Sequence, residues 1–211
     1  MLWKGSSKPM AQAQQKEIRS IWTPANIVTC VRIVFIPVFM LFATDAFLCL
    51  GMSSYAQAVV AFVLYVILSL TDKVDGTLAR SRGEVTDFGK FLDPIADKLL
   101  VFSALLVLLA QGMVNVWPVF IILFREFLVS ALRMVASANG QVIAADKLGK
   151  WKTATTMMAL CGFLLLPVVA DSGMPFGLWM VCQVLFGIAV VLTIVSGVQY
   201  FYNARNIVFR V

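Results

Sequence analysis

The stretch LTDKVDGTLARSRGEVTDFGKFLDPIADKLL (residues 70–100) joins two long apolar runs in a chain that is 61% hydrophobic. It carries two pairs of aspartates at helical spacing, first Asp72 with Asp75 and then Asp93 with Asp97. Residues three or four apart share one face of an α-helix. A single aspartate at membrane depth costs roughly 2.5–3.5 kcal/mol on insertion scales. Four of them beside apolar runs therefore indicate a function that compensates for this cost.

Apolar runs of about 20 residues recur along the chain, and only 13% of its residues are charged. The sequence predicts an all-α, polytopic membrane protein with six transmembrane helices. These are expected at 24–44, 56–80, 89–112, 116–138, 150–171 and 176–203. The first is expected to begin at Thr23-Pro24, a capping residue followed by proline. The predicted domains are an N-terminal cytoplasmic or interfacial segment at 1–22, a six-helix membrane domain at 23–205 and a cytoplasmic tail at 206–211.

The positive charges predict an orientation. All 17 Lys and Arg residues fall on one side of the predicted topology, and the opposite connections contain Asp45 and Asp171 without any positive residue. Because cytoplasmic loops collect Lys and Arg, both termini and the aspartate-bearing stretch at 70–100 are expected to face the cytoplasm. A bacterial plasma membrane is the predicted location, with the mitochondrial inner membrane as the alternative. The net charge of +6 fits anionic lipids and phosphorylated ligands rather than nucleic acid.

Two residue types narrow the chemistry. Histidine is absent, which excludes phosphohistidine intermediates, histidine bases and histidine metal ligands. The four cysteines, Cys30, Cys49, Cys161 and Cys182, are far apart and lie in or beside apolar segments, so they predict packing residues rather than a zinc site or a disulfide framework. Any catalysis must then use carboxylates, Lys, Arg or hydroxyl groups.

The aspartate pairs predict a metal site. A short connection makes the two helices that carry them antiparallel neighbours, so the four carboxylates can converge on one pocket. Such a cluster repels itself unless cations neutralise it, and oxygen-only ligands select two divalent ions, Mg²⁺ or Mn²⁺. A pair of these ions can drive in-line phosphoryl displacement. The alternative is that the aspartates form ordinary ion pairs with neighbouring Lys and Arg.

The pattern Asp72-x-x-Asp75-Gly76-x-x-Ala79-Arg80, followed by Gly89-x-x-x-Asp93-x-x-x-Asp97, resembles the signature of the CDP-alcohol phosphatidyltransferase family. The resemblance implies six transmembrane helices, a cytoplasm-facing pocket and a homodimer. It implies that Asp72, Asp75 and Asp93 hold two metal ions, with Asp97 a further ligand and the general base. It also implies that the cytidine diphosphate part of CDP-diacylglycerol is received by Gly76, Ala79, Arg80 and Gly89.

Four other residues are candidates for the CDP-diacylglycerol pocket. The Thr86 hydroxyl can face the pocket or cap a helix. Asn26, Thr29 and Arg32 recur on one face of the first helix. They can line the nucleotide pocket, or they can form a polar contact between helices while Arg32 snorkels to the cytoplasm.

A second cluster of bases predicts an acceptor that itself carries a phosphate; its members are Arg125, Arg133, Lys147, Lys150 and Lys152. Arg125-Glu126 favours a partnered arginine directed into the bundle. Segments 23–37, 124–133 and 147–153 resemble those of bacterial family members that use sn-glycerol 3-phosphate. This implies transfer of the phosphatidyl group of CDP-diacylglycerol to sn-glycerol 3-phosphate, with release of CMP. Thr156 departs from that pattern, because many of those members have glutamine there.

Several alternatives stay open at this point. Within the family, an inositol phosphate acceptor is the first alternative, followed by a cardiolipin-forming enzyme or one with an uncharged acceptor. Outside it, acidic residues in transmembrane helices also mark ion pathways, so a divalent-cation carrier is possible, as is a membrane scaffold without catalysis. The expected partners are CDP-diacylglycerol, sn-glycerol 3-phosphate, membrane lipids and a second copy of the chain, with no nucleic acid.

Overall fold

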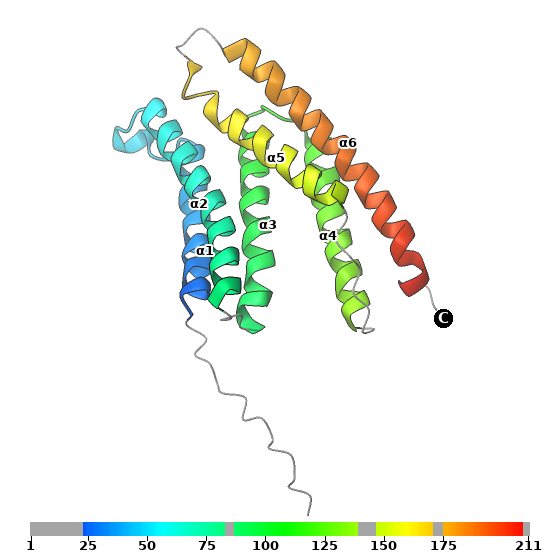
Figure 1. Cartoon of the computed structure of the whole chain (residues 1–211). Coiled ribbons are helices and arrows are strands. Elements are labelled where there is room, and N and C mark those ends of the chain that lie inside the picture. Colours follow the sequence, from blue (N-terminus) through cyan, green and yellow to red (C-terminus); the bar gives the residue numbers. More distant parts are fainter. Residues whose placement is uncertain (1–22, 83–86, 139–146, 171–174, 209–211) are drawn as a thin grey trace, which may run out of the picture.

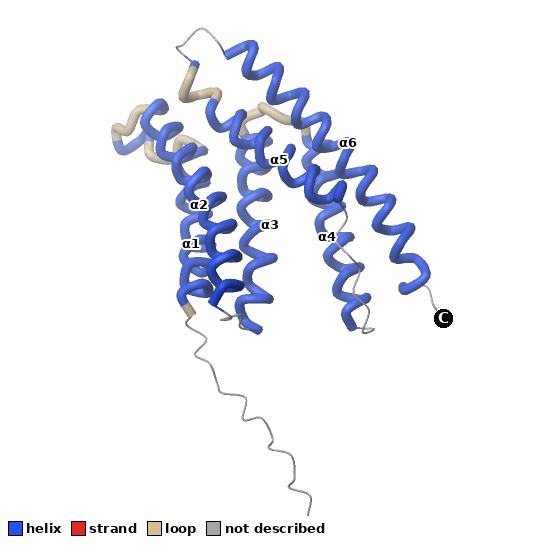
Figure 2. Tube along the Cα trace, in the orientation of Figure 1, coloured by secondary structure: helices blue, strands red, loops and turns tan. Residues whose placement is uncertain are grey.

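A computed structural model describes residues 23–82, 87–138, 147–170 and 175–208. Its described part consists of helices joined by loops and turns, with no strand (Figure 2). The all-α prediction is therefore confirmed. The elements are α1 (Pro24–Ala43), the 3-10 helix η1 (Leu48–Leu50), α2 (Ser54–Arg82), α3 (Asp87–Ala110), α4 (Val116–Ala138), α5 (Lys147–Leu165) and α6 (Pro175–Val208).

The ends of three helices have clear local causes. α1 begins as predicted, since the Thr23 hydroxyl accepts a hydrogen bond from the Asn26 amide at 3.4 Å and Pro24 occupies the first helical position. α5 ends at Leu165, before the predicted 171, because Pro167 disfavours helical backbone at the residue before it. α6 continues past the predicted 203, and Arg205 stacks on the Tyr202 ring at 3.9 Å in its last turns.

The helices alternate in direction and form two groups (Figure 1). α1 packs against α2 and α3, while α4 and α5 both pack against α6. α5 also contacts α2 and α3, and so connects the two groups. The prediction that the second and third helices are antiparallel neighbours is confirmed, because α2 and α3 run in opposite directions and touch.

The core and the outer surface are both apolar. Large side chains from several helices are fully buried between them, among them Phe39 of α1, Leu105 of α3 and Phe163 of α5. α5 and α6 approach closely at Gly162, where an added Cβ would overlap the Cys182 sulfur. Among the described residues, Cys30, Cys161 and Cys182 are not joined in a disulfide. The outer surface exposes many large apolar side chains, which suits a lipid environment.

Within the described residues, length and composition allow three helices to cross a membrane, at Asn26–Ala43 in α1, Ser54–Thr71 in α2 and Phe176–Asn203 in α6. Charged residues lower the apolar character of the other three, for example Asp97 and Lys98 in α3 and Arg125 and Glu126 in α4. All six predicted helices are present as α-helices in the described part of the chain. Six membrane spans, cytoplasmic termini and the predicted domain limits stay predictions.

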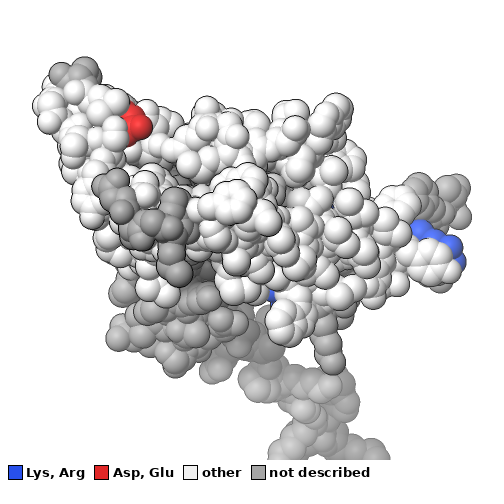
Figure 3. Space-filling view, turned by 90° about the horizontal axis from the view of Figure 1, so that it is seen from above, with Lys and Arg blue, Asp and Glu red and all other residues white. Residues whose placement is uncertain are grey.

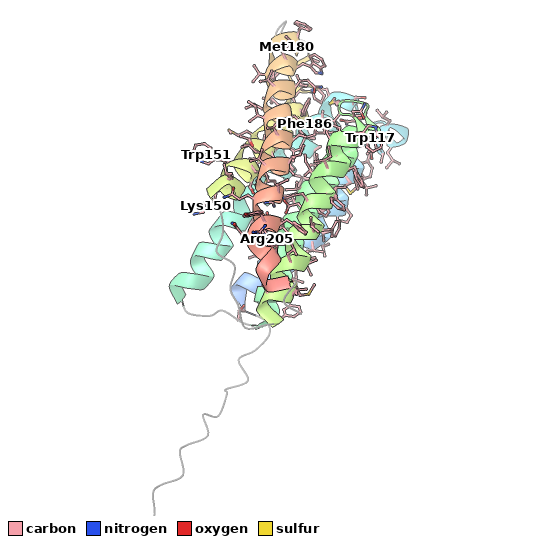
Figure 4. The ribbon with its side chains drawn as sticks, turned by 90° about the vertical axis from the view of Figure 1, so that its right-hand side faces the viewer. Trp117, Lys150, Trp151, Met180, Phe186 and Arg205 are labelled. Atoms are coloured by element: carbon pink, nitrogen blue, oxygen red, sulfur yellow. The ribbon has the colours of Figure 1, made fainter. Side chains whose placement is uncertain are left out.

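Charge is distributed unevenly along the bundle. Seen from above, the described surface is almost uncharged, with one acidic patch, basic atoms at one edge and a small basic spot near the lower middle (Figure 3). In a side view, Met180 and Trp117 lie toward the upper end, whereas Lys150 and Arg205 lie lower (Figure 4). The upper end is the one at which α1, α3 and α5 end and α2, α4 and α6 begin. The described basic side chains thus lie away from that end.

Candidate active site

The aspartate-bearing positions lie at one end of two touching helices. Positions 72 and 75 fall in the last part of α2, and positions 93 and 97 fall in the first half of α3. Because α2 ends and α3 begins at the lower end of the bundle, the four positions share that end (Figure 1). Among the described side chains, no group of three acids or cysteines lies together. Convergence on one pocket stays a prediction, since the description omits the side chains of Asp72, Asp75 and Asp93.

Asp97 is the one motif aspartate whose side chain is described, and it faces the middle of the bundle. It is partly buried and interacts electrostatically with Lys152 of α5 and Tyr65 of α2. The fully buried Tyr65 donates a hydrogen bond to the Met157 sulfur at 3.3 Å, which ties α2 to α5 beside this point. Gly89, two turns before Asp97 on α3, is also buried. Asp97 therefore lies between the two groups of helices.

The polar face of α1 is directed inward. Asn26, Thr29 and Arg32 are 3%, 1% and 2% exposed, respectively. One of the two interpretations of Arg32 was that it snorkels to the aqueous surface, and this is wrong because its side chain is buried. α1 packs against the two helices that carry the aspartates, so this face suits the nucleotide pocket. That role stays a prediction. The roles of Gly76, Ala79 and Arg80 also stay predictions, because their part of α2 is described by its backbone alone, and Thr86 lies outside the described residues.

An ion-pair cluster joins α4, α5 and α6. Arg125 Nη1 donates to Glu126 Oε1 at 3.0 Å, and Lys152 forms an ion pair with the same oxygen. Arg125 Nη2 donates to the Ser196 hydroxyl of α6 at 3.2 Å. That hydroxyl donates in turn to the Thr193 carbonyl, which leaves its lone pairs free to accept from the guanidinium. The predicted partnered arginine directed into the bundle is confirmed.

The Arg125 guanidinium of this cluster has one further hydrogen-bond donor, its Nε atom. The Nε atom of Arg125 is buried and finds no hydrogen-bond acceptor among the described residues. A buried donor without a partner is costly, and here it lies in a guanidinium that Glu126 and Ser196 hold in place. The arrangement therefore has an unused donor available for an anionic ligand.

A second contact anchors α4 to α3. The Ser130 hydroxyl accepts from Lys98 and donates to the Glu126 carbonyl at 2.6 Å. Thr156 stands where many family members that use sn-glycerol 3-phosphate are expected to have glutamine. Its side chain is buried, and its hydroxyl donates to the Lys152 carbonyl at 2.8 Å. Its hydroxyl is thus used on its own helix, close to the cluster.

The five bases of the predicted acceptor cluster do not all meet. Arg125 and Lys152 share Glu126, but Arg133 is exposed and donates from Nε to the Tyr200 hydroxyl at 3.1 Å. Lys150 is exposed beside Trp151 on the outer side of α5 (Figure 4), and the side chain of Lys147 is not described. Sequence reasoning missed Ser196 and Gly197. Their signal is a pair of small residues in an otherwise apolar helix, typical of close helix packing.

A cavity of about 240 Å³ lies at the other end of the bundle, between the ends of α1, α3 and α5 and the start of α2. Asp45 is the charged residue in its lining, and Gln111 and Tyr55 contribute polar atoms. A negative wall without a cation is unsuited to a phosphate. This cavity is therefore not the candidate site.

Comparisons with known protein sequences identify the family of this chain. The sequence profile of the CDP-alcohol phosphatidyltransferases matches residues 22–195. The chain belongs to this family. The matched part runs from α1 into α6 and includes both aspartate pairs and the Arg125–Glu126–Lys152 cluster. The family assignment made from the aspartate motif is thus confirmed.

Three bacterial relatives cover most of the chain. The CDP-diacylglycerol--glycerol-3-phosphate 3-phosphatidyltransferase of Bacillus subtilis is 41% identical over 83% of this chain and 92% of its own length. A probable phosphatidylglycerophosphate synthase of Mycobacterium tuberculosis is 39% identical over 85% of this chain and 80% of its own. The Rickettsia bellii protein with the same name as the first is 37% identical over 86% and 94%.

Gly197 is expected to control the position of Arg125. A Cβ at this position would lie 3.1 Å from Arg125 Cγ, so Gly197→Ala should displace the guanidinium by a few tenths of an ångström. Because Arg125 is predicted to bind the acceptor phosphate and small misplacements of binding groups are costly, we expect a severalfold higher KM for the acceptor and an unchanged KM for CDP-diacylglycerol. Gly187→Ala on the same helix is the matched control, because its Cβ would meet nothing within 4 Å. Equal kinetics of the two variants would contradict this role.

Proposed function

We propose that this CDP-alcohol phosphatidyltransferase transfers the phosphatidyl group of CDP-diacylglycerol to sn-glycerol 3-phosphate, giving phosphatidylglycerol phosphate and CMP. Family membership and the names of the three relatives support the reaction. The observation that carries the choice of acceptor is the buried pair of cations, Arg125 and Lys152, with Lys152 within electrostatic range of Asp97. An acceptor whose phosphate binds these cations would present its hydroxyl group near a carboxylate.

Two divalent ions, Mg²⁺ or Mn²⁺, fit the donor set. Hard cations prefer oxygen ligands, and the chain has four aspartates at one end of two touching helices and no histidine. Asp97, the member whose side chain is described, is directed into the bundle as such a site requires. We assign the ions to Asp72, Asp75, Asp93 and Asp97, where they would neutralise charge on the diphosphate.

The protein's own groups then have separate tasks. Arg125 and Lys152 bind the acceptor phosphate and orient the acceptor, with Arg133, Lys147 and Lys150 attracting it from the surroundings. Asp97 accepts the proton of the attacking hydroxyl group while the oxygen of that hydroxyl forms a bond to the β-phosphorus of CDP-diacylglycerol. The bond from that phosphorus to the oxygen of the α-phosphate breaks, and CMP leaves with that oxygen.

The donor occupies the other half of the site. Gly76, Ala79, Arg80, Thr86 and Gly89 receive the cytidine diphosphate, and the inward face of α1, with Asn26, Thr29 and Arg32, completes the pocket. The acyl chains lie among the lipids that surround an apolar outer surface. In this proposal all six helices span a bacterial plasma membrane with both termini and the site toward the cytoplasm, and the protein is a homodimer.

The reaction is tested by CMP release from purified protein in detergent, with CDP-diacylglycerol and Mg²⁺ or Mn²⁺. We compare sn-glycerol 3-phosphate with inositol 1-phosphate and free inositol, each before and after removal of metal by EDTA. Release with sn-glycerol 3-phosphate alone, lost with EDTA and restored by either metal, is the expected result. Release with an inositol compound instead would contradict the proposed acceptor. Release that persists in excess EDTA would contradict the metal assignment.

A further inference from the structure

Among the described residues, Glu126 is contacted by donors at only one of its two carboxylate oxygens. Arg125 and Lys152 both bind Oε1, and among the described residues no donor binds Oε2. The side chain is 17% exposed, so it is mostly removed from bulk water. A carboxylate oxygen in such a place is a strong hydrogen-bond acceptor that is not yet used.

The charge of Glu126 is unfavourable for the phosphate that the cluster is proposed to bind. It cancels one of the two positive charges of Arg125 and Lys152 and repels an anion. Holding those cations in place requires only Oε1, which both of them contact. The second oxygen is therefore available for another part of the acceptor.

The chemistry of the acceptor indicates which part this is. sn-Glycerol 3-phosphate carries its phosphate at one end, the attacking primary hydroxyl at the other and a secondary hydroxyl between them. In the proposed function the phosphate lies at Arg125 and Lys152, and the primary hydroxyl lies at Asp97. Lys152 both binds Glu126 and interacts with Asp97, so the two carboxylates share this lysine as a neighbour.

We propose that Glu126 Oε2 accepts a hydrogen bond from the secondary hydroxyl of the acceptor and so determines acceptor specificity. This inference rests on the proposed function. A site built to hydrogen-bond a substrate hydroxyl rejects an analogue without it, because the polar group of the site is left without its partner. For a bond to a charged acceptor, the expected discrimination is roughly 10- to 100-fold in kcat/KM.

The first part of the test uses the wild-type protein and acceptors that differ at one carbon. 3-Hydroxypropyl phosphate lacks the secondary hydroxyl, and dihydroxyacetone phosphate has a carbonyl there, which accepts but cannot donate. We expect kcat/KM for both to be roughly 10- to 100-fold below that for sn-glycerol 3-phosphate. Equal values for sn-glycerol 3-phosphate and 3-hydroxypropyl phosphate would overturn the inference without any variant.

The second part uses Glu126→Gln. Its amide oxygen can still accept from Arg125 and Lys152, while its NH₂ group takes the place of Oε2 and donates. The ratio of kcat/KM for dihydroxyacetone phosphate to that for sn-glycerol 3-phosphate should therefore rise about tenfold. Asp45→Asn is the matched control, since it removes an exposed carboxylate in the α1–α2 connection and should leave the ratio unchanged.

The outcomes separate this inference from the proposed function. A uniform loss with all three acceptors in Glu126→Gln would mean that Glu126 only positions Arg125 and Lys152, and would overturn the specificity role while leaving the reaction intact. Absence of wild-type turnover with sn-glycerol 3-phosphate would instead refute the proposed function and, with it, this inference.

Discussion

Asp97→Asn is expected to lower kcat by roughly 10²- to 10⁴-fold, the range for loss of a general base. The amide cannot take the proton of the attacking hydroxyl, and it is a poorer ligand for a divalent ion than a carboxylate. Binding of CDP-diacylglycerol should be largely retained, because the proposed nucleotide contacts lie on α1, α2 and the start of α3. The measurement is CMP release at saturating substrates, together with a binding assay for the liponucleotide.

The exposed Asp45 offers a control for this variant. Asp45→Asn changes the same functional group far from the motif and should keep full activity. If Asp97→Asn kept a kcat within a few-fold of the wild type, Asp97 would be neither the base nor a required metal ligand. The mechanism would then need a different proton acceptor.

Arg125→Ala should raise the KM for the acceptor by roughly 10- to 100-fold, with a much smaller effect on the KM for CDP-diacylglycerol. The change removes the guanidinium that Glu126 and Ser196 hold in place and the buried Nε that has no described partner. Hydrogen bonds to charged groups contribute roughly 1.5–3 kcal/mol, which corresponds to this range. Initial rates with each substrate varied in turn separate the two effects.

Arg125→Lys refines this prediction. Lysine keeps the charge but loses the planar fork of donors, so its KM for the acceptor should lie between those of the wild type and Arg125→Ala. Arg205→Ala, which removes an exposed guanidinium stacked on Tyr202, should behave as the wild type. Equal increases in the KM of both substrates would place Arg125 outside the acceptor site.

Features that depend on neighbouring residues in the chain could be predicted from the sequence. The start of α1 follows from Thr23 and Pro24, and the number of helices follows from apolar runs separated by charged or turn-forming stretches. The end of α5 was placed too late because the hydrophobic run continues past Pro167 while the helical backbone does not. The family assignment came from the resemblance of the Asp, Gly, Ala and Arg pattern at residues 72–97 to the family signature, and the profile match confirms it.

Features that depend on packing between helices could not be predicted. Arg125 and Arg133 lie on the same helix, yet Arg125 meets Ser196 whereas Arg133 meets Tyr200. Nothing in the spacing of α4 indicates which residues of α6 it meets. The same holds for Arg32, whose burial depends on how α2 and α3 pack around α1. Sharing of Glu126 by cations from two helices is likewise a property of the assembled bundle.

The division of the helices into two groups has a consequence for inhibition. The proposed donor site lies on α1, α2 and α3, whereas the acceptor cations lie on α4 and α5, and α5 connects the groups through its contacts with α2 and α3. Alignment of the two substrates then depends on the apolar part of this interface beyond Asp97 and Lys152, where buried side chains such as Leu105 of α3 and Phe163 of α5 belong to one core. A lipophilic compound that wedges into this interface from the bilayer would separate donor from acceptor, and neither substrate at high concentration would displace it.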